Sequence, residues 1–304
     1  MGIRLYIEPK LQKPDLVASW PGIGNIGLIA ADTLRRQIGG EELGEIEPWD
    51  FFYPRRVIIK DGILTDLEFP SNKFYYQRLA KKDLILFIGE EQPIDGGRVY
   101  AEGKKAYQIA NLVLDVAERF GCQRVYTSGA AVALTRHTLK PRVWAVTSSE
   151  SLIKEVKSYE NTVLMSEIEG RGDWGSISGL NGLLLGLARK RGFEAICLMG
   201  EIPDYLSGAP FPYPRASKSV LEVLTNLLGI QISYDALDDW AAQMDEIIGG
   251  IYEKLPPDIK EKIEQRENVV RAKPEMITDE DKEWIKKHID ELFKKGGRGD
   301  DRAS

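Results

Sequence analysis

The chain has 304 residues, 43% of them hydrophobic, and a formal net charge of −6. That is enough for one large globular domain with or without an appendage, and the lack of a strongly basic stretch argues against nucleic acid as a partner. Apolar runs such as 183–187 are too short to cross a bilayer, and residues 1–9 lack the apolar segment of a signal peptide. We therefore expect no membrane association and a cytoplasmic location.

Cysteine and histidine are scarce. The two cysteines, Cys122 and Cys197, fall at or near predicted buried strands, where a reduced thiol behaves as a small hydrophobic group. Together with His137 and His288 they show no spacing typical of metal ligands. We therefore expect no disulfide framework, no bound metal and no cofactor.

Up to about residue 230, apolar runs alternate with helical patterns. Several runs, with 84–88 the clearest, are continuous rather than alternating, which favours strands covered by helices on both faces. The predicted strands are 5–8, 16–20, 57–60, 63–69, 84–89, 124–128, 143–147, 163–168 and 195–200. The predicted helices are 28–38, 103–120, 179–190 and 216–228.

One pair of strands departs from the alternating pattern. The strands at 57–60 and 63–69 are joined by Asp61-Gly62, a dipeptide that suits a two-residue primed turn and predicts a β-hairpin. The acidic segment 41–48 ends in a proline and is a poor candidate for a central parallel strand. The sheet is therefore expected to be mixed, in an α/β fold.

Beyond residue 233 the pattern becomes helical. Residues 235–254 predict an amphipathic helix whose apolar side includes Trp240 and Ile247, and a weak capping box at Thr278 begins a last helix that runs through Phe293. This extension either docks on the sheet domain or binds a partner. We favour docking, because each helix carries an apolar stripe that needs covering.

These patterns divide the chain into three parts. An α/β domain is expected over residues 1–232 and a helical extension over residues 233–295, followed by a disordered tail over residues 296–304.

The segment 22–27 has the spacing G-x-G-x-x-G between a predicted strand and a predicted helix. Gly22, Gly24, Asn25 and Gly27 could present backbone N–H groups to an anion there. A dinucleotide site would also need an acidic residue at the end of a second parallel strand, and the acidic segment 41–48 does not supply a suitable one. Close packing of the helix on the strand is therefore the favoured interpretation.

Three predicted strands end in loops that contain a glutamate: Glu90, Glu167 and Glu201. If the strands are parallel and adjacent, these carboxylates share one edge of the sheet, with Arg171 close to Glu167. Such a cluster could bind a small molecule or perform acid–base chemistry. A solvated polar rim is the alternative, and we favour it because no nucleophile paired with a base accompanies the carboxylates.

Two further segments leave alternatives open. His137 follows a strand, but no G-x-S-x-G elbow occurs, so a loop histidine beside an arginine is favoured over a catalytic one. Tyr205, Phe211 and Tyr213 precede a helix in a proline-rich segment, and they form either an exposed patch for a partner or a cover for the edge of the sheet.

Four segments in this order resemble the PAC2 family, the proteasome assembly chaperone 2-like proteins. They are Trp20-Pro21-Gly22-Ile23-Gly24-Asn25-Ile26-Gly27, Ile177-Ser178-Gly179-Leu180-Asn181-Gly182-Leu183-Leu184-Leu185-Gly186, Cys197-Leu198-Met199-Gly200-Glu201 and Pro214-Arg215-Ala216-Ser217-Lys218. The resemblance implies a three-layer α/β/α sandwich akin to nucleoside phosphorylases, with a mixed, largely parallel sheet. It implies no established catalytic residues, a tendency to form homo-oligomers, and proteasome α-subunits as partners where the organism has them.

The chain departs from that family in one respect. It ends in Arg302-Ala303-Ser304 rather than in the hydrophobic-Tyr-X tail by which some of these chaperones engage the proteasome, so docking by tail insertion is not expected. The sequence supports a non-enzymatic, protein-binding homo-oligomer that acts as an assembly factor. The alternative is a protein or enzyme that binds a nucleotide, nucleoside or phosphate at the Gly-rich turn and the acidic edge.

Overall fold

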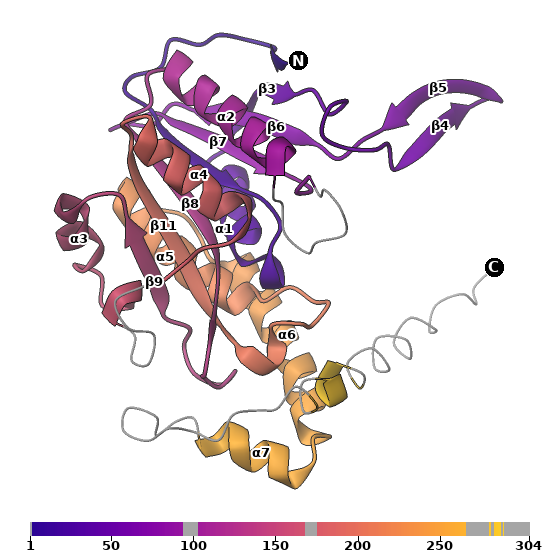
Figure 1. Ribbon diagram of the computed structural model, residues 1–304, viewed down its shortest axis with the longest axis vertical. Helices are drawn as coiled ribbons and strands as arrows, with labels where there is room; N and C mark the ends of the chain where they lie inside the picture. Colours follow the sequence, from indigo (N-terminus) through magenta and orange to yellow (C-terminus); the bar gives the residue numbers. More distant parts are fainter. Residues whose placement is uncertain are drawn as a thin grey trace.

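The computed structural model of the chain describes residues 2–93, 103–167 and 175–265, together with residues 280, 283–286 and 288. These residues form a three-layer α/β/α sandwich from which a two-stranded arm projects (Figure 1). The strands are β1 (Ile3–Leu5), β2 (Asp15–Ser19), β3 (Glu41–Ile46), β4 (Arg56–Lys60), β5 (Ile63–Glu68), β6 (Asn72–Gln77), β7 (Leu84–Gly89), β8 (Arg124–Ala133), β9 (Val143–Thr147), β10 (Thr162–Leu164) and β11 (Glu194–Pro203).

The α-helices are α1 (Ile26–Gln37), α2 (Gly103–Arg119), α3 (Glu150–Val156), α4 (Gly179–Lys190), α5 (Pro214–Leu228), α6 (Asp235–Glu253) and α7 (Pro257–Glu264). Short 3-10 helices are η1 (Ile23–Asn25), η2 (Met165–Glu167) and η3 (Asp204–Leu206).

The central sheet has nine strands in the order β1-β3-β6-β7-β2-β8-β11-β9-β10. Its four central strands, from β7 to β11, run parallel, whereas β1, β3 and β6 pair antiparallel on one side and β9 runs antiparallel to β11 on the other. The expected mixed sheet in a three-layer α/β fold is therefore confirmed.

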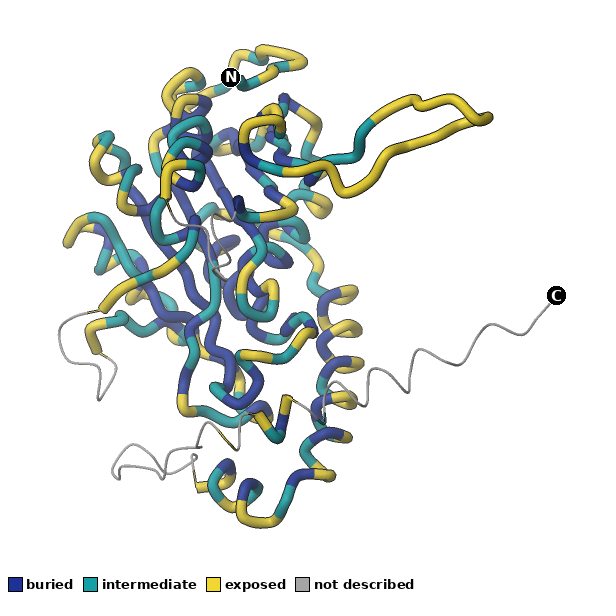
Figure 2. The backbone as a smooth tube through the Cα atoms, turned by 45° about the vertical axis from the view of Figure 1, so that its right-hand side comes forward, coloured by how far each residue is buried: buried dark blue, intermediate teal, exposed yellow. Residues whose placement is uncertain are grey.

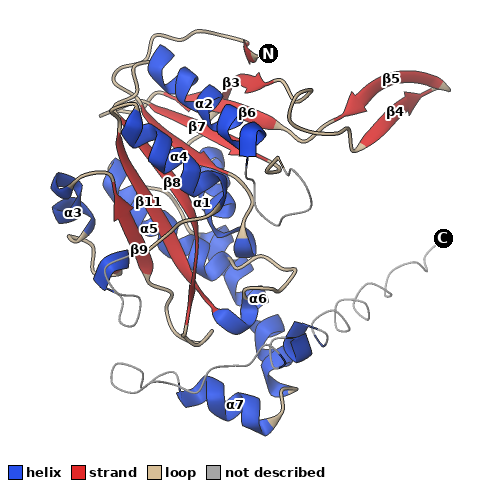
Figure 3. Cartoon of the chain, in the orientation of Figure 1, coloured by secondary structure: helices blue, strands red, loops and turns tan. Residues whose placement is uncertain are grey.

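Helices cover both faces of this sheet (Figure 3). Helices α2 and α4 pack on one face, and α1 and α5 pack on the other, with α6 lying against α5. In β2, Leu16 and Ala18 join the α2/α4 core, while Val17 between them joins the α1/α5 core. The continuous apolar run arises because successive side chains of one strand enter two different cores. Strand β2 is buried throughout, and the centre of the sheet is mostly buried (Figure 2).

The sequence did not predict two of the outer strands. Strand β3 lies in the acidic segment that we judged unsuitable for a central parallel strand, and it is instead an antiparallel strand near the edge. Strand β6 has alternating burial, typical of a strand near the edge of a sheet. Strand β8 also runs on to Ala133, because the small residues from Gly129 onward continue to pair with β11.

Helices α6 and α7 extend the α1/α5 core beyond residue 233. Leu237, Met244 and Ile248 of α6 are buried in that core, as favoured for a docked extension. Trp240 and Ile247 are the exception: the sequence pattern places both on the apolar side of the helix, but they lie at the margin of the buried stripe and are exposed. The last predicted helix falls largely, and the tail entirely, outside the described residues.

Among the helices of the described part of the chain, none combines the length and the apolar character needed to cross a bilayer.

Candidate functional site

The Gly-rich turn links the end of β2 to the start of α1 through η1. Gly24 and Asn25 have φ angles of +59° and +50°, in the left-handed region. Glycine occupies this region without strain and asparagine tolerates it. The backbone N–H of Tyr213 donates to the carbonyl of Gly24 at 2.8 Å, so the turn is also tied to the start of α5.

Close packing accounts for the glycine at position 27. A Cβ there would lie 2.4 Å from the carbonyl oxygen of Ser128 on β8, and the Ser128 hydroxyl donates to the Gly27 carbonyl at 3.3 Å. A Cβ at Gly24 would lie 3.0 Å from the Cβ of Tyr213. Gly22 differs, since a Cβ there would have no neighbour within 4 Å. Gly27 therefore serves the approach of α1 to β8, as the favoured interpretation expects, whereas Gly24 serves the approach of the turn to Tyr213.

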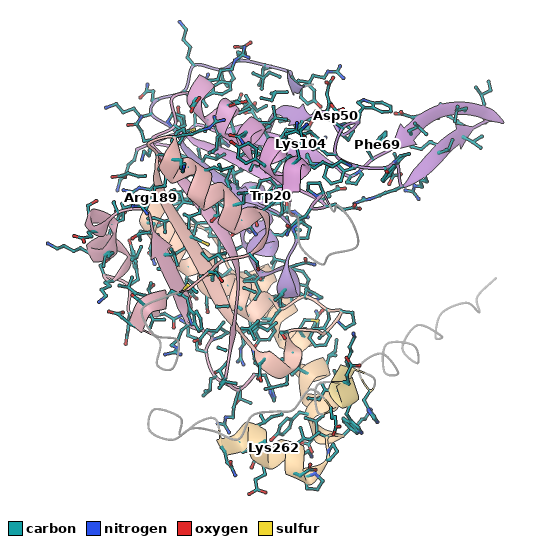
Figure 4. The ribbon with its side chains drawn as sticks, viewed as in Figure 1. Trp20, Asp50, Phe69, Lys104, Arg189 and Lys262 are labelled. Atoms are coloured by element: carbon teal, nitrogen blue, oxygen red, sulfur yellow. The ribbon has the colours of Figure 1, made fainter. Side chains whose placement is uncertain are left out.

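A hydrogen-bond network joins this turn to the N-terminus of α4. The backbone N–H of Trp20 donates to Oδ1 of Asn181 at 3.3 Å, and Nε2 of Gln92 donates to the carbonyl of Pro21 at 2.5 Å. Oε1 of Gln92 accepts from the backbone N–H of Leu180 at 3.2 Å. Trp20, labelled in Figure 4, follows β2. It is fully buried, and its ring centroid lies 4.9 Å from that of Phe87.

A cavity of about 240 Å³ lies between these segments. Its described lining includes Gly22 from the turn, Gly129 from β8, Ser178 and Asn181 from the start of α4, and Cys197 from β11. Three of the four segments that resemble the PAC2 family, 20–27, 177–186 and 197–201, therefore line one cavity. Their spacing in the sequence does not predict this.

Glu90, the first of the three glutamates, fixes the base of the arm. Its carboxylate accepts from Arg55 at 2.9 Å and from the backbone N–H of Ser71 at 3.0 Å, while Glu91 pairs with Arg55 at 2.6 Å. Both carboxylates are half-exposed. They act as anchors for the chain entering and leaving β4 and β5.

Glu167 lies elsewhere, because β10 runs antiparallel to β11. Its carboxylate pairs with Lys157 and accepts from the backbone N–H of Leu164 at 3.2 Å; the bond to Lys157 lowers the pKa of Glu167. The expectation of one shared edge is therefore wrong for this residue. Arg171 lies outside the described residues.

Glu201 is a buried member of β11 with 2% exposure. Its Oε1 accepts from Nε of Arg142 at 2.9 Å and from Nε1 of Trp144 at 2.7 Å, and its Oε2 accepts from the backbone N–H of Arg142 at 3.0 Å. A carboxylate with this many donors is a satisfied structural ion pair joining β9 to β11. No group of three metal-ligating side chains occurs in the part of the chain that the structure describes.

The three aromatic residues before α5 are buried. Tyr205, Phe211 and Tyr213 all join the α1/α5 core, so the exposed patch considered for a partner is not present, and these side chains cover the sheet instead. Both cysteines are free and buried, as expected.

His137 is held by hydrogen bonds to its neighbours rather than by a catalytic partner. The Tyr205 hydroxyl lies 2.7 Å from its Nδ1 and accepts from its backbone N–H at 2.9 Å, and Arg215 donates to its carbonyl at 2.6 Å. Tyr252 of α6 packs against the ring at 5.1 Å. Burial, with the charges of Arg215 and Arg136, lowers the pKa of His137.

This shift predicts a pH dependence of stability. The imidazole takes up a proton more readily in the unfolded chain, where its pKa is about 6.5, so stability is lost as the pH falls through about 6.5 and is retained above it. His137→Asn keeps an acceptor for Tyr205 without the titration. Urea unfolding between pH 7.5 and 5.5 should show a larger loss for the wild type than for this variant. Equal losses in the two proteins would contradict the assignment of the pH dependence to His137. Asp245, whose pKa is raised by burial, is present in both proteins and so does not contribute to the difference between them.

The arm formed by β4 and β5 is a second candidate site. The sequence predicts the hairpin, but it does not predict that the hairpin projects from the body of the protein. The turn residues Asp61 and Gly62 have φ angles of +53° and +77°, as a primed turn requires. Figure 2 shows the arm projecting from the body and exposed along its length. Its large apolar residues are 39% to 68% exposed: Val57, Ile58, Ile59, Ile63 and Leu64.

The register of the arm places apolar pairs on one face. Val57 lies opposite Leu67, and Ile59 lies opposite Leu64, because a β-bulge at Thr65 shifts the pairing by one residue. Directly opposite residues share a face, as do residues two apart on one strand. The other face carries pairs with a charged member, such as Arg56 with Glu68. The arm is thus amphipathic, and its apolar face is exposed.

Known proteins are similar to this chain in sequence and in fold. The profile of the PAC2 family matches residues 16–251. The chain belongs to the PAC2 family. It is 32% identical over 242 residues to the uncharacterized protein MJ1210 of Methanocaldococcus jannaschii, which covers 80% of this chain and 84% of that protein.

Solved structures of PAC2-like proteins superpose on it. A Pyrococcus furiosus protein, PbaB, described as an archaeal proteasome activator, has a TM-score of 0.68 at 28% identity and covers 82% of this chain and 98% of its own. PbaA of the same organism, described as an archaeal homolog of proteasome-assembly chaperone, has a TM-score of 0.59 at 23% identity and covers 89% and 100%. A PAC2 family protein from Streptomyces avermitilis has a TM-score of 0.62 at 21% identity and covers 82% and 99%. The last two likenesses concern the fold alone.

Proposed function

We propose that this PAC2 protein is a non-enzymatic, protein-binding assembly factor that acts as a homo-oligomer and engages proteasome α-subunits. The exposed apolar face of the β4–β5 arm carries the proposal. An isolated two-stranded hairpin is marginally stable in water, and contiguous exposed apolar surface marks sites of protein association.

A second copy of the chain is the occupant that fits the arm. The two-stranded sheet leaves one unpaired edge on each of β4 and β5, which another strand can extend. A two-fold pair would use the same exposed surface of Val57, Ile59 and Leu64 twice, once from each copy.

The proteasome as a partner rests on the relatives. PbaB, at 28% identity, is described as a proteasome activator, and the fold is shared with a proteasome-assembly chaperone homolog. A separate observation supports the non-enzymatic part of the proposal. The carboxylates of Glu90, Glu167 and Glu201 are each paired with a different basic side chain and form no joint acid–base centre.

Affinity capture tests the partner. The full chain, immobilised through a tag, is exposed to purified α-subunits and to intact core particles of the source organism. We expect α-subunits to be retained at physiological salt and an unrelated protein of similar charge not to be. If neither α-subunits nor core particles are retained, proteasome engagement is contradicted. Self-association is tested separately, by measuring the mass of the free protein.

A further inference from the structure

The cavity beside the Gly-rich turn has the form of a ligand site. It lies just beyond the carboxyl end of β2, where β8 and β11 continue side by side: β2 pairs with β8 only as far as Ala18 with Thr127, whereas β11 pairs with β8 through Ala133. Open α/β sheets bind ligands outside the carboxyl ends of their parallel strands. The position therefore suits a small molecule.

Glycine keeps two walls of this cavity open. A Cβ at Gly22 would meet no atom within 4 Å, and a Cβ at Gly129 would meet only Nδ2 of Asn181, at 3.9 Å. Neither residue has a positive φ angle. Steric crowding and backbone conformation thus do not require glycine at these two positions, whereas crowding does at Gly27. The space beside them is available to a ligand.

Asn181 supplies an uncommitted donor to this space. The residue lines the cavity, is 8% exposed and uses Oδ1 to accept from the Trp20 N–H, while its Nδ2 has no partner among the described residues. The Nδ2 atom is accessible from the cavity that Asn181 lines, so it is available to donate to an acceptor bound there.

The first turn of α4 adds further donors. Ser178 occupies the N-cap position, but its hydroxyl makes no capping bond, and the helix runs for 12 residues behind it. The N-terminal N–H groups of such a helix carry a partial positive charge. Among them, the N–H of Leu180 is already used by Gln92. The start of α4 thus adds partial positive charge to the wall of the cavity that Ser178 and Asn181 line.

The rest of the described lining is apolar or neutral. Trp144, Met165, Ile177 and Met199 provide apolar surface, and burial raises the pKa of the Cys197 thiol to about 11, so that it stays protonated. None of the described lining residues carries an ionised side chain. A ligand here meets both hydrogen-bond donors and apolar side chains, and no charged side chain of the described lining.

We propose that the cavity binds a small organic acid, whose carboxylate accepts from Asn181 Nδ2 and the first turn of α4 while its apolar part packs on Met165, Met199 and Trp144. The volume corresponds to about eight water molecules, which suits a small ligand of about ten non-hydrogen atoms. This site is independent of the arm and of proteasome engagement.

Ligand-observed NMR on the full chain tests this site. The probes are benzoate, phenylacetate and 4-methyl-2-oxopentanoate, each beside its neutral amide. We expect saturation transfer to at least one acid and at least tenfold weaker binding of its amide. The absence of saturation transfer to all three acids, or equal binding of an acid and its amide, would overturn the proposal.

Variants then locate the binding. Asn181→Asp keeps the acceptor for Trp20 but replaces the free donor with a negative charge, and should weaken the acid at least tenfold. Gly129→Val and Gly22→Val each fill the cavity from a different wall, so either one tests it if the other fails to fold. Gly186→Ala, at an open position elsewhere on α4, is the control and should bind as the wild type does. Wild-type affinity in folded Asn181→Asp or in a folded filling variant would contradict this location.

Discussion

Replacing Gly27 by alanine should destabilise the protein by about 3 kcal/mol or more. The added Cβ would lie 2.4 Å from the carbonyl oxygen of Ser128, and this neighbour is backbone on a central strand rather than a flexible side chain. Relief requires helix α1 to move off β8, and forced overpacking of this kind typically costs 1–3 kcal/mol, with rigid sites at the upper end. Urea unfolding at a fixed protein concentration measures the change.

Gly22→Ala is the matched control within the same motif. Its φ angle of −161° is extended backbone and its Cβ position is open, so the free energy of unfolding should change by less than about 0.5 kcal/mol. A similar loss in both variants would show that the glycines share some role other than packing. The pair thus separates the close approach of α1 to β8 from a general need for glycine in the turn.

Removing the guanidinium of Arg142 should cost about 2–3 kcal/mol. Arg142→Met leaves the carboxylate of Glu201 buried with only Trp144 and one backbone N–H as donors, and an uncompensated buried charge is strongly destabilising. The figure is below that for a fully buried pair because the Arg142 side chain is 53% exposed and partly screened by water.

The reverse change should be milder. Glu201→Gln keeps the acceptor for Trp144, loses the acceptor for the backbone N–H of Arg142, and releases the Arg142 guanidinium to solvent, which we expect to cost about 1 kcal/mol. The double variant should then be close to Glu201→Gln alone, because the charge that Arg142 neutralises is gone. Additive losses in this cycle, measured by urea unfolding, would contradict a coupled pair.

The sequence predicted the fold better than the site, for physical reasons. Continuous apolar runs such as the one in β7 identify strands covered on both faces, and an Asp-Gly turn identifies a hairpin. The strand containing Glu41 and Glu42 was harder to recognise because an antiparallel strand near a sheet edge buries fewer of its residues. Whether three strand ends meet depends on strand order and direction, which the local sequence pattern does not encode. Glu167 and Glu201 lie apart because β10, which precedes Glu167, runs antiparallel to β11.

The exposed arm shows a similar limit. The run Val57-Ile58-Ile59 is as apolar as a core strand, and nothing local distinguishes a strand covered by helices from one that projects into solvent. Conversely, the prolines around Tyr205, Phe211 and Tyr213 leave an exposed patch open as an interpretation, yet all three side chains are buried in the core that includes residues of α1, α5 and α6. Burial is decided by tertiary packing. The apolar run of the arm is exposed, and the aromatic residues of the proline-rich segment are buried.

Sedimentation velocity of the full chain tests the central claim, that the arm holds a second copy. The wild type should sediment as a multiple of the chain mass, and Ile59→Ser/Leu64→Ser, on the apolar face, should sediment as a single chain with unchanged circular dichroism. Ile58→Ser/Lys60→Ser, on the opposite face, is the matched control and should retain the wild-type mass. A wild type that sediments as a single chain at every concentration, or an apolar-face variant that keeps the wild-type mass, would contradict the account.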